Sequence, residues 1–251
     1  MCGISGFILK KANNRLGLEI LKRMVSVLTH RGPDNKGFWK NSEETQFIGH
    51  SRLSIQDLSI NGNQPMSSSS GQYIISYNGE IYNHLEIREY LNKKKKINWK
   101  GSSDTETILE SFSVMGINET VNKLQGMFAF CVIDTRQNLL YLVRDRFGEK
   151  PLYYGLLDSN LIFASELKAI VSFPDFKKKI NRKSINYYFN FSYIPEPFSI
   201  FENIFKLESG QILTFNLRDN QIVSNKKYDI LSDKNNLNIN KENYIDLFDQ
   251  T

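Results

Sequence analysis

The sequence predicts an α+β protein built on antiparallel sheets, and two kinds of observation support this prediction. Short apolar or alternating segments recur along the 251 residues and are interrupted by Gly, Asn and Ser. Their spacing favours hairpins over repeated strand–helix–strand units. The hydrophobic content of 40% and the charged content of 24% are ordinary for a globular protein of this length and suffice for a sizeable core.

Eight segments are expected to be strands because they are short, apolar or alternating, and bounded by turn residues. They are residues 4–9, 47–50, 73–77, 127–133, 139–144, 152–157, 161–164 and 212–217. Three helices are expected between them, at residues 18–28, 104–114 and 182–189. In the first helix, apolar residues at positions 18, 21, 24, 25 and 28 share one face.

Charge and composition exclude several classes of partner. The net charge is +5, but the basic run 93–96 is interpreted as a solvated loop, and neither this run nor the run 177–179 carries a nucleic-acid motif. No apolar run is long enough to span a membrane, and no signal-peptide pattern opens the chain. The three His and two Cys lack metal-ligand spacing. Cys131 lies in an apolar strand-like run, which favours a free thiol and a cytoplasmic setting.

The most informative residue is Cys2, directly after the initiator methionine. Removal of Met1, which a small second residue permits, would leave a thiol and a free α-amine on one residue. The thiolate is a nucleophile, and an α-amine with a pKa of about 7.7–8.0 is a usable base near neutral pH. Cys2 therefore has the chemistry of an N-terminal nucleophile that carries its own base. The alternative is a cysteine on a frayed, exposed terminus.

Eight further observations come from short motifs that occur in a fixed order. They are Cys2-Gly-Ile-Ser-Gly-Phe7, His30-Arg-Gly-Pro-Asp34, Gly49-His-Ser-Arg-Leu-Ser-Ile55, Asn63-Gln-Pro-Met66, Tyr77-Asn-Gly-Glu-Ile-Tyr-Asn83, Ser103-Asp-Thr-Glu106, Arg144-Asp-Arg-Phe-Gly-Glu-Lys-Pro-Leu-Tyr-Tyr154 and Phe163-Ala-Ser-Glu-Leu-Lys168. Each motif is weak alone, but the ordered set resembles the N-terminal glutaminase half of glutamine-dependent asparagine synthetases. These enzymes are class II glutamine amidotransferases of the N-terminal-nucleophile type.

The resemblance covers residues 2–217 and implies a four-layer αββα sandwich of two antiparallel sheets between helices. It implies hydrolysis of L-glutamine to glutamate and ammonia through a γ-glutamyl thioester on Cys2. Asn78 and Gly79 would form the oxyanion hole, with the Asn side-chain amide and the Gly backbone N–H as donors. The glutamine-binding residues implied by the resemblance are Arg52, Leu53, Ser54, Ile55, Asn78, Gly79, Glu80 and Asp104.

Within that set, Arg52 suits the α-carboxylate of glutamine because its planar fork can form two hydrogen bonds to a carboxylate. Asp104 would bind the α-ammonium group, with Glu80 helping at the same end. The residues alone leave other interpretations open: a hairpin turn for Asn78-Gly79, a helix N-cap for Asp104, and surface positions for Arg52 and Glu80.

Two other polar groups are expected to have structural roles. By resemblance, the segment that contains His30 and Arg31 is a structural loop near the site. Asp145, Arg146 and Lys150 are interpreted as a buried or interface charge cluster, not as ligands of the substrate.

The resemblance also implies a C-terminal synthetase half that uses the ammonia. Its Ser-Gly-Gly-x-Asp-Ser-type ATP-binding loop does not occur in this sequence, and residues 218–251 are expected to be a linker and the start of that domain. The synthetase would act in cis or in trans and convert aspartate to asparagine. ATP and Mg²⁺ are expected only there, and no cofactor is expected for residues 2–217.

Three alternatives remain open at the level of the sequence. The chain could be a partner-dependent or non-catalytic glutamine-binding module, an amidotransferase for a carboxylate other than aspartate, or an N-terminal-nucleophile hydrolase of another amide. A homodimer is compatible with the sequence, which leaves the oligomeric state and the removal of Met1 open.

Overall fold

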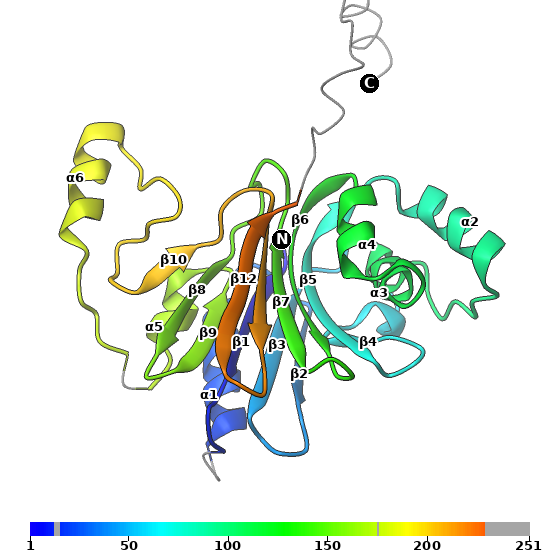
Figure 1. Ribbon diagram of the computed structural model, residues 1–251, viewed down its shortest axis with the longest axis horizontal. Helices are drawn as coiled ribbons and strands as arrows, with labels where there is room; N and C mark the ends of the chain where they lie inside the picture. Colours follow the sequence, from blue (N-terminus) through cyan, green and yellow to red (C-terminus); the bar gives the residue numbers. More distant parts are fainter. Residues whose placement is uncertain (13–15, 175, 229–251) are drawn as a thin grey trace, which may run out of the picture.

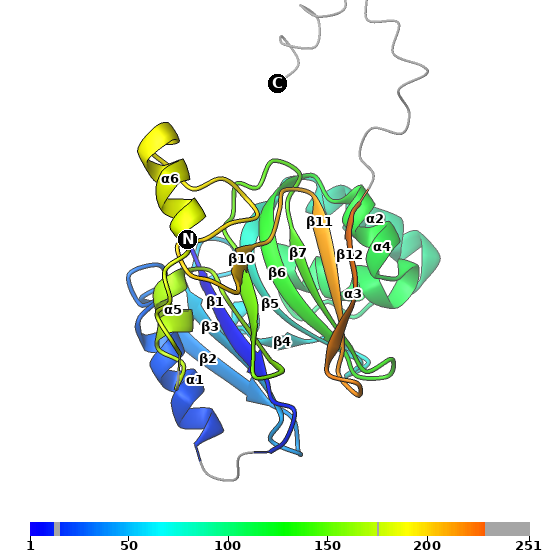
Figure 2. The ribbon, with the colours of Figure 1, turned by 60° about the vertical axis from the view of Figure 1, so that its left-hand side comes forward.

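Two six-stranded antiparallel sheets stack face to face at the centre of the protein (Figures 1 and 2). The computed structural model describes residues 1–12, 16–174 and 176–228. The first sheet has the order β10-β8-β9-β1-β3-β2, and the second has the order β12-β11-β7-β6-β5-β4. The strands are β1 Gly3–Ile8, β2 Asn35–Lys40, β3 Gln46–Arg52, β4 Met66–Ser67, β5 Tyr73–Ile81, β6 Gly126–Asp134, β7 Leu139–Arg144, β8 Tyr153–Leu157, β9 Asn160–Ala164, β10 Ile204–Lys206, β11 Gln211–Asn216 and β12 Gln221–Lys227.

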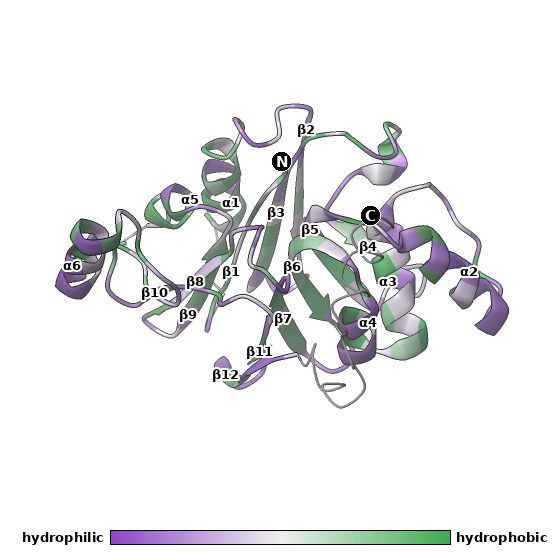
Figure 3. Cartoon of the chain, turned by 90° about the horizontal axis from the view of Figure 1, so that it is seen from above, coloured by the Kyte–Doolittle hydropathy of each residue, from purple (hydrophilic) through white to green (hydrophobic). Residues whose placement is uncertain are grey.

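Helices cover the outer face of each sheet, which gives the four-layer αββα sandwich that was expected (Figure 3). On one side lie α1 (Gly17–Ser26) and α5 (Leu167–Val171), and on the other lie α2 (His84–Lys94), α3 (Asp104–Met115) and α4 (Ile117–Lys123). The sixth helix, α6 (Arg182–Phe191), projects at the end of the first sheet near β10 (Figure 1). Among the described residues, no helix has the length and apolar character needed to cross a bilayer.

The alternation of side chains along each strand explains the layers. In β6, Ala129 and Cys131 pack in the core between the two sheets, whereas Phe128 and Phe130 pack under α3. Both faces of this strand are buried, so its sequence is a continuous apolar run and not an alternating one. Burial raises the pKa of Cys131 to about 12, so this thiol is expected to be unreactive at neutral pH.

All eight expected strands and all three expected helices are present. The sequence pattern missed β2, β4, β10 and β12, which are short or rich in polar residues, and did not delimit α2, α4 and α5. The prediction of a linker from residue 218 is wrong for Gln221–Lys227, because these residues pair with β11 as an edge strand. Most of their side chains are exposed, and backbone pairing with β11 holds the strand. The expected domain start near Tyr244 lies outside the described residues.

Ser76 on β5 makes two polar contacts with β3 inside the common core of the sheets, one to His50 and one from its Oγ to the carbonyl oxygen of Gly49 at 3.3 Å. Nδ1 of His50 on β3 lies 2.9 Å from Oγ of Ser76 on β5, and both residues are fully buried. Nε2 of His50 has no hydrogen-bond partner among the described residues. Burial, aided by the charge of Arg52, lowers the pKa of His50 to about 3, so the imidazole is neutral in the folded protein.

This histidine predicts a loss of stability in mild acid. In the unfolded chain His50 binds a proton near pH 6.5, but in the folded protein only near pH 3. Between these values the unfolded state binds more protons, so the free energy of unfolding falls as the pH falls. The expected loss is about 2 kcal/mol between about pH 7 and pH 5. Denaturant unfolding of the wild type and of His50→Gln over this range tests it. A variant with the same pH slope as the wild type would show that His50 is not responsible.

Candidate active site

A cavity of about 130 Å³ lies where Cys2, the ends of β3 and β5, and the first turn of α3 meet. Eight of the nine residues predicted from the sequence line it. They are Cys2, Arg52, Leu53, Ile55, Asn78, Gly79, Glu80 and Asp104. Ser54 is the exception, because it does not line the cavity and its backbone N–H donates to Oδ2 of Asp34 at 2.7 Å.

Cys2 immediately precedes β1 and is held against the chain after β3. Its Sγ donates to the carbonyl oxygen of Leu53 at 3.6 Å, and the N–H of Leu53 donates to Sγ at 3.4 Å. Burial raises the pKa of the Cys2 thiol, while the N–H of Leu53 and the terminal ammonium group act in the opposite direction. The backbone of Leu53 can therefore accept from the thiol or donate to the thiolate.

While Met1 is retained, the free amine belongs to Met1, which also lines the cavity. Partial burial lowers the pKa of this amine; Cys2 raises it, and the positive charges of Arg31 and Lys150 lower it further. While Met1 is present, the nitrogen of Cys2 is part of a peptide bond and cannot act as a base. Removal of Met1 would place a free amine on Cys2 itself.

Asn78 and Gly79 lie within β5, which pairs with β6 over nine residue pairs from Tyr73↔Asp134 to Ile81↔Gly126. The alternative of a hairpin turn at these two residues is therefore wrong. The side chain of Asn78 is only 1% exposed, and its Nδ2 has no hydrogen-bond partner among the described residues. A Cβ on Gly79 would lie 2.3 Å from the carbonyl oxygen of Met127, so the close approach of β6 requires glycine here. An unpaired buried amide beside Cys2 is a candidate oxyanion donor.

Asp104 is the first residue of α3 and is 5% exposed. The N-cap is Ser103, whose Oγ accepts from the N–H of Glu106 at 3.3 Å, so the alternative of an N-cap at Asp104 is wrong. Oδ2 of Asp104 accepts from the Tyr77 hydroxyl at 2.6 Å and from the N–H of Ile81 at 3.0 Å. Burial raises the pKa of Asp104, although these two hydrogen bonds oppose the rise. Both bonds use Oδ2, so Oδ1 is the oxygen that can face a ligand.

Arg52 ends β3 and is fixed by the loop that follows it. Its Nη1 donates to the carbonyl oxygen of Ser59 at 3.0 Å and to Oδ1 of Asn63 at 2.7 Å, and its Nη2 donates to the carbonyl oxygen of Asp57. Among the described residues, none accepts a hydrogen bond from Nε. A Cβ on Gly62 would lie 2.2 Å from Nη2, so glycine is required for the loop to approach the guanidinium group. The side chain is therefore fixed at the cavity, and it keeps N–H donors, including Nε, that no described residue uses.

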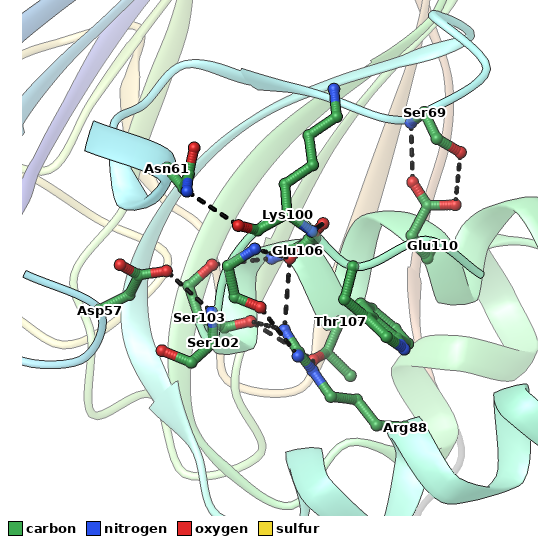
Figure 4. Close-up of polar contacts among 12 residues, drawn as sticks. Asp57, Asn61, Ser69, Arg88, Lys100, Ser102, Ser103, Glu106, Thr107 and Glu110 are labelled. Carbon is green, nitrogen blue, oxygen red and sulfur yellow. Dashed lines mark hydrogen bonds and ion pairs between the residues drawn. The ribbon is translucent and has the colours of Figure 1, made fainter. Parts of the chain in front are cut away.

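A second polar network holds the walls that carry Arg52 and Asp104 against each other (Figure 4). The loop before α3 is bound to the loop after β3 through two hydrogen bonds, from the N–H of Ser102 to Oδ2 of Asp57 and from Nδ2 of Asn61 to the carbonyl oxygen of Lys100. Arg88 of α2 donates to the carbonyl oxygens of Gly101 and Ser103. This network fixes the distance between the two residues that are expected to bind a substrate's charged groups.

Several cavity residues were not predicted from the sequence. Gln64 is buried and bridges two walls: its Oε1 accepts from the N–H of Tyr77 at 2.7 Å, and its Nε2 donates to Oγ1 of Thr105 at 3.3 Å. Gln64 lies in the Asn63-Gln-Pro-Met66 motif, so the motif could have identified it as a residue of the site. Gln56 also lines the cavity, and its Nε2 lies 3.4 Å from Oε1 of Glu80.

Asp145 and Lys150 of the expected charge cluster are buried, but neither forms an ion pair among the described residues. Asp145 is fully buried and accepts from backbone N–H groups, including those of Glu149 and Lys150. Arg146 donates to the carbonyl oxygens of Asn122 and Leu124. Lys150 is buried, lines the cavity and has no carboxylate within 4 Å among the described residues. Asp145 thus shapes a loop that presents Lys150 to the cavity.

The loop of His30 and Arg31 does lie beside the site, as expected. Nε of Arg31 donates to the carbonyl oxygen of Cys2 at 2.9 Å. His30 does not contact Cys2; its Nε2 lies 2.9 Å from Oε1 of Glu166.

Comparison with known proteins gives a consistent result. The family model of the glutamine amidotransferase domain matches residues 1–229. A Methanocaldococcus jannaschii protein, provisionally named as a second glutamine-hydrolyzing asparagine synthetase, is 38% identical over 244 residues, which cover 88% of this chain and 45% of the relative. Glutamine-hydrolyzing asparagine synthetase 1 of Bacillus subtilis is 37% identical over 230 residues, or 91% of this chain and 35% of the relative. The chain thus spans about a third to a half of the length of these relatives.

Among solved structures, the glutamine phosphoribosylpyrophosphate amidotransferase of B. subtilis has a similar fold. The TM-score is 0.66 with 18% sequence identity, and the match covers 91% of this chain and 49% of that chain.

Proposed function

Because this chain belongs to the glutamine amidotransferase domain family, we propose that it hydrolyses the side-chain amide of L-glutamine with Cys2 as the nucleophile. After removal of Met1, the α-amine of Cys2 takes the thiol proton, and the thiolate attacks the amide carbon of glutamine. The amine then returns the proton to the leaving nitrogen, and ammonia departs. Water hydrolyses the resulting γ-glutamyl thioester to glutamate and regenerates the thiol.

The tetrahedral intermediate carries negative charge on the former carbonyl oxygen. The side-chain amide of Asn78 and the backbone N–H of Gly79 are the proposed donors to this oxygen. The observation that carries the proposal is that the amide of Asn78, buried and without a partner among the described residues, lines the same cavity as the sulfur of Cys2.

Arg52 and Asp104 are the proposed anchors for the charged head group of glutamine. Arg52 supplies a fixed cation for the α-carboxylate, and Asp104 supplies an anion for the α-ammonium group. The two opposite charges at one cavity favour a free amino acid over an amide without such a head group. This is the reason to prefer glutamine to the substrates of other N-terminal-nucleophile hydrolases.

The direct test is release of glutamate and ammonia from glutamine by the purified chain, together with its intact mass. Turnover by protein that lacks Met1 supports the proposal. Absence of turnover, with Met1 removed and glutamine bound in a calorimeter, would favour the alternative of a glutamine-binding module that needs a partner.

Asparagine synthesis is the proposed use of the ammonia, because the relatives named above are glutamine-hydrolyzing asparagine synthetases of greater length. In this proposal a synthetase half, in cis or in trans, binds ATP and Mg²⁺ and amidates aspartate. The roles proposed for residues 1–228 involve neither ATP nor Mg²⁺. Amidation of another carboxylate, a homodimer and a cytoplasmic location stay predictions from the sequence.

Replacement of Asp104 by Asn is expected to raise KM for glutamine about 10- to 100-fold, because a charge-assisted hydrogen bond contributes about 1.5–3 kcal/mol. The pH dependence gives a second readout. Burial raises the pKa of Asp104, so its protonation should raise the wild-type KM as the pH falls, at a higher pH than for a free aspartate. Asp104→Asn should lack this dependence. If the variant keeps the wild-type KM, Asp104 does not bind the ammonium group.

A further inference from the structure

We propose that Glu166 is a positioning residue for Cys2 and acts through Arg31; this inference rests on the proposed glutaminase activity. Glu166 belongs to the Phe163-Ala-Ser-Glu-Leu-Lys168 motif, to which the proposed chemistry gives no role. It lies two residues after the end of β9 and is the N-cap residue of α5. It does not line the cavity, so any effect on the reaction must pass through another residue.

Cys2 needs such support because it lies outside the regular part of its sheet. The pairing of β1 with β9 begins at Ser5↔Ala164, and the pairing of β1 with β3 begins at Gly3↔Ser51. The first residues of a chain are mobile unless other groups hold them. A nucleophile at this position must be located by contacts beyond the strand ladder, since a displacement of about 1 Å can lower a rate 100-fold.

Two contacts from the segment after β9 supply this support. The first is direct: Ser165 accepts from the N–H of Ile4 through its Oγ and donates its own N–H to the carbonyl oxygen of Ile4, both at 2.9 Å. The second reaches Cys2 through Arg31, whose Nε donates to the carbonyl oxygen of Cys2 at 2.9 Å. Cys2 and Ile4 are thus both held from the same short segment.

Arg31 can hold Cys2 only if its own long side chain is fixed. Its Nη1 donates to Oε1 of Glu166 at 2.8 Å, and the guanidinium side chain is only 7% exposed. Partial burial acts to raise the pKa of Glu166, but hydrogen bonds from Arg31 and its other partners hold it at about 2. Glu166 is therefore an anion under all working conditions, and a planar guanidinium group connects this anion to the backbone of the nucleophile.

Glu166 has two further partners, His30 and Lys168, and Lys168 provides the matched control. Nζ of Lys168 lies 3.1 Å from Oε2 of Glu166, and this lysine is about half exposed. Lys168 has no contact with Arg31 among the described residues. Removal of Lys168 deletes one partner of Glu166 but leaves the connection from Glu166 to Arg31 and Cys2 intact.

The test compares Glu166→Ala, Glu166→Gln and Lys168→Ala in protein shown by mass to lack Met1. Glu166→Ala should lower kcat about 10- to 100-fold with KM for glutamine within about twofold of wild type, since Cys2 is displaced and the head-group anchors are not. Glu166→Gln keeps an acceptor for Nη1 of Arg31 and should recover most of kcat. Lys168→Ala should stay within about twofold of wild type.

Alkylation of the Cys2 thiol by iodoacetamide gives a readout that does not require turnover. Its rate should rise in Glu166→Ala, because a displaced Cys2 loses part of the burial that raises its thiol pKa, and Cys131 does not interfere because it is fully buried. Arg31→Ala and the double variant Arg31→Ala/Glu166→Ala should have equal kcat values, because Glu166 acts through Arg31. Unchanged kcat and alkylation in Glu166→Ala, or equal losses in Glu166→Ala and Lys168→Ala, would overturn the inference. Lack of turnover by the wild type would instead reject the proposed function, and the alkylation rates would still decide the role of Glu166.

Discussion

Replacement of Cys2 by alanine is expected to reduce glutamine hydrolysis to background, a loss of about 10⁴-fold or more. The sulfur is the nucleophile that attacks the glutamine amide in the proposed reaction, and its hydrogen bonds to Leu53 place it at the cavity. Alanine is also a small second residue, so removal of Met1 should proceed as in the wild type. The measurement is glutamate release, with intact mass to confirm the new N-terminus.

Two comparisons make this result interpretable. Calorimetry should show that Cys2→Ala still binds glutamine, because Arg52 and Asp104 are unchanged. Cys131→Ala should retain wild-type turnover, since that side chain is fully buried between the sheets. If Cys2→Ala kept its activity, neither the nucleophile nor the mechanism proposed above would be correct.

Replacement of Asn78 by leucine is expected to lower kcat about 10²- to 10³-fold and, at the same time, to leave the protein as stable as the wild type or more so. The first effect follows from the loss of an oxyanion donor. The second follows because the Nδ2 group of Asn78 is buried without a partner among the described residues, and such a group costs about 1–3 kcal/mol. Steady-state kinetics and denaturant unfolding of the same preparation measure both.

Asn83, five residues along the same segment, provides a control with the opposite expectation. Its Nδ2 donates to the carbonyl oxygen of Lys123 at 2.9 Å, and its Oδ1 accepts from the N–H of Gln125 at 3.1 Å. Asn83→Leu should therefore lose stability and keep kcat, because Asn83 does not line the cavity. A large loss of stability in Asn78→Leu, with no loss of kcat, would mean that the amide has a structural role instead.

The apolar strands could be predicted from the sequence because buried strands consist mainly of apolar residues, and such runs are visible in the sequence itself. The edge strands β2 and β12 could not, because their side chains are largely exposed and backbone pairing to a neighbour stabilises them. Asn78-Gly79 shows the same limit within the site. Locally the pair favours a turn, and its position inside β5 depends on the pairing with β6, about 50 residues away in the chain.

Most of the candidate site was identified because its residues fall in recognisable motifs, and eight of nine line one cavity. Residues that reach the cavity through tertiary contacts were harder to assign. Lys150 looked like part of a charge cluster, but backbone N–H groups satisfy Asp145 and leave the lysine side chain at the cavity. For Ser54 the resemblance, which implies that the backbone of residues 53–55 lines the pocket, does not hold: its N–H donates to Asp34, and the residue does not line the cavity.

The central position of β1 has a consequence for how the protein is made. The ribosome synthesises the nucleophile's strand first, yet β1 lies between β3 and β9, and Ile4 is bound by Ser165, 161 positions later in the chain. Because a contact of such sequence separation forms only after the later segment has emerged, the pairing of β1 with β9 and the contact of Ile4 with Ser165 can be completed only after more than half of the chain has been synthesised. The nascent N-terminus stays unpaired during that interval, and Met1 remains exposed after folding, so a methionine aminopeptidase can reach the terminus both before and after β1 is paired.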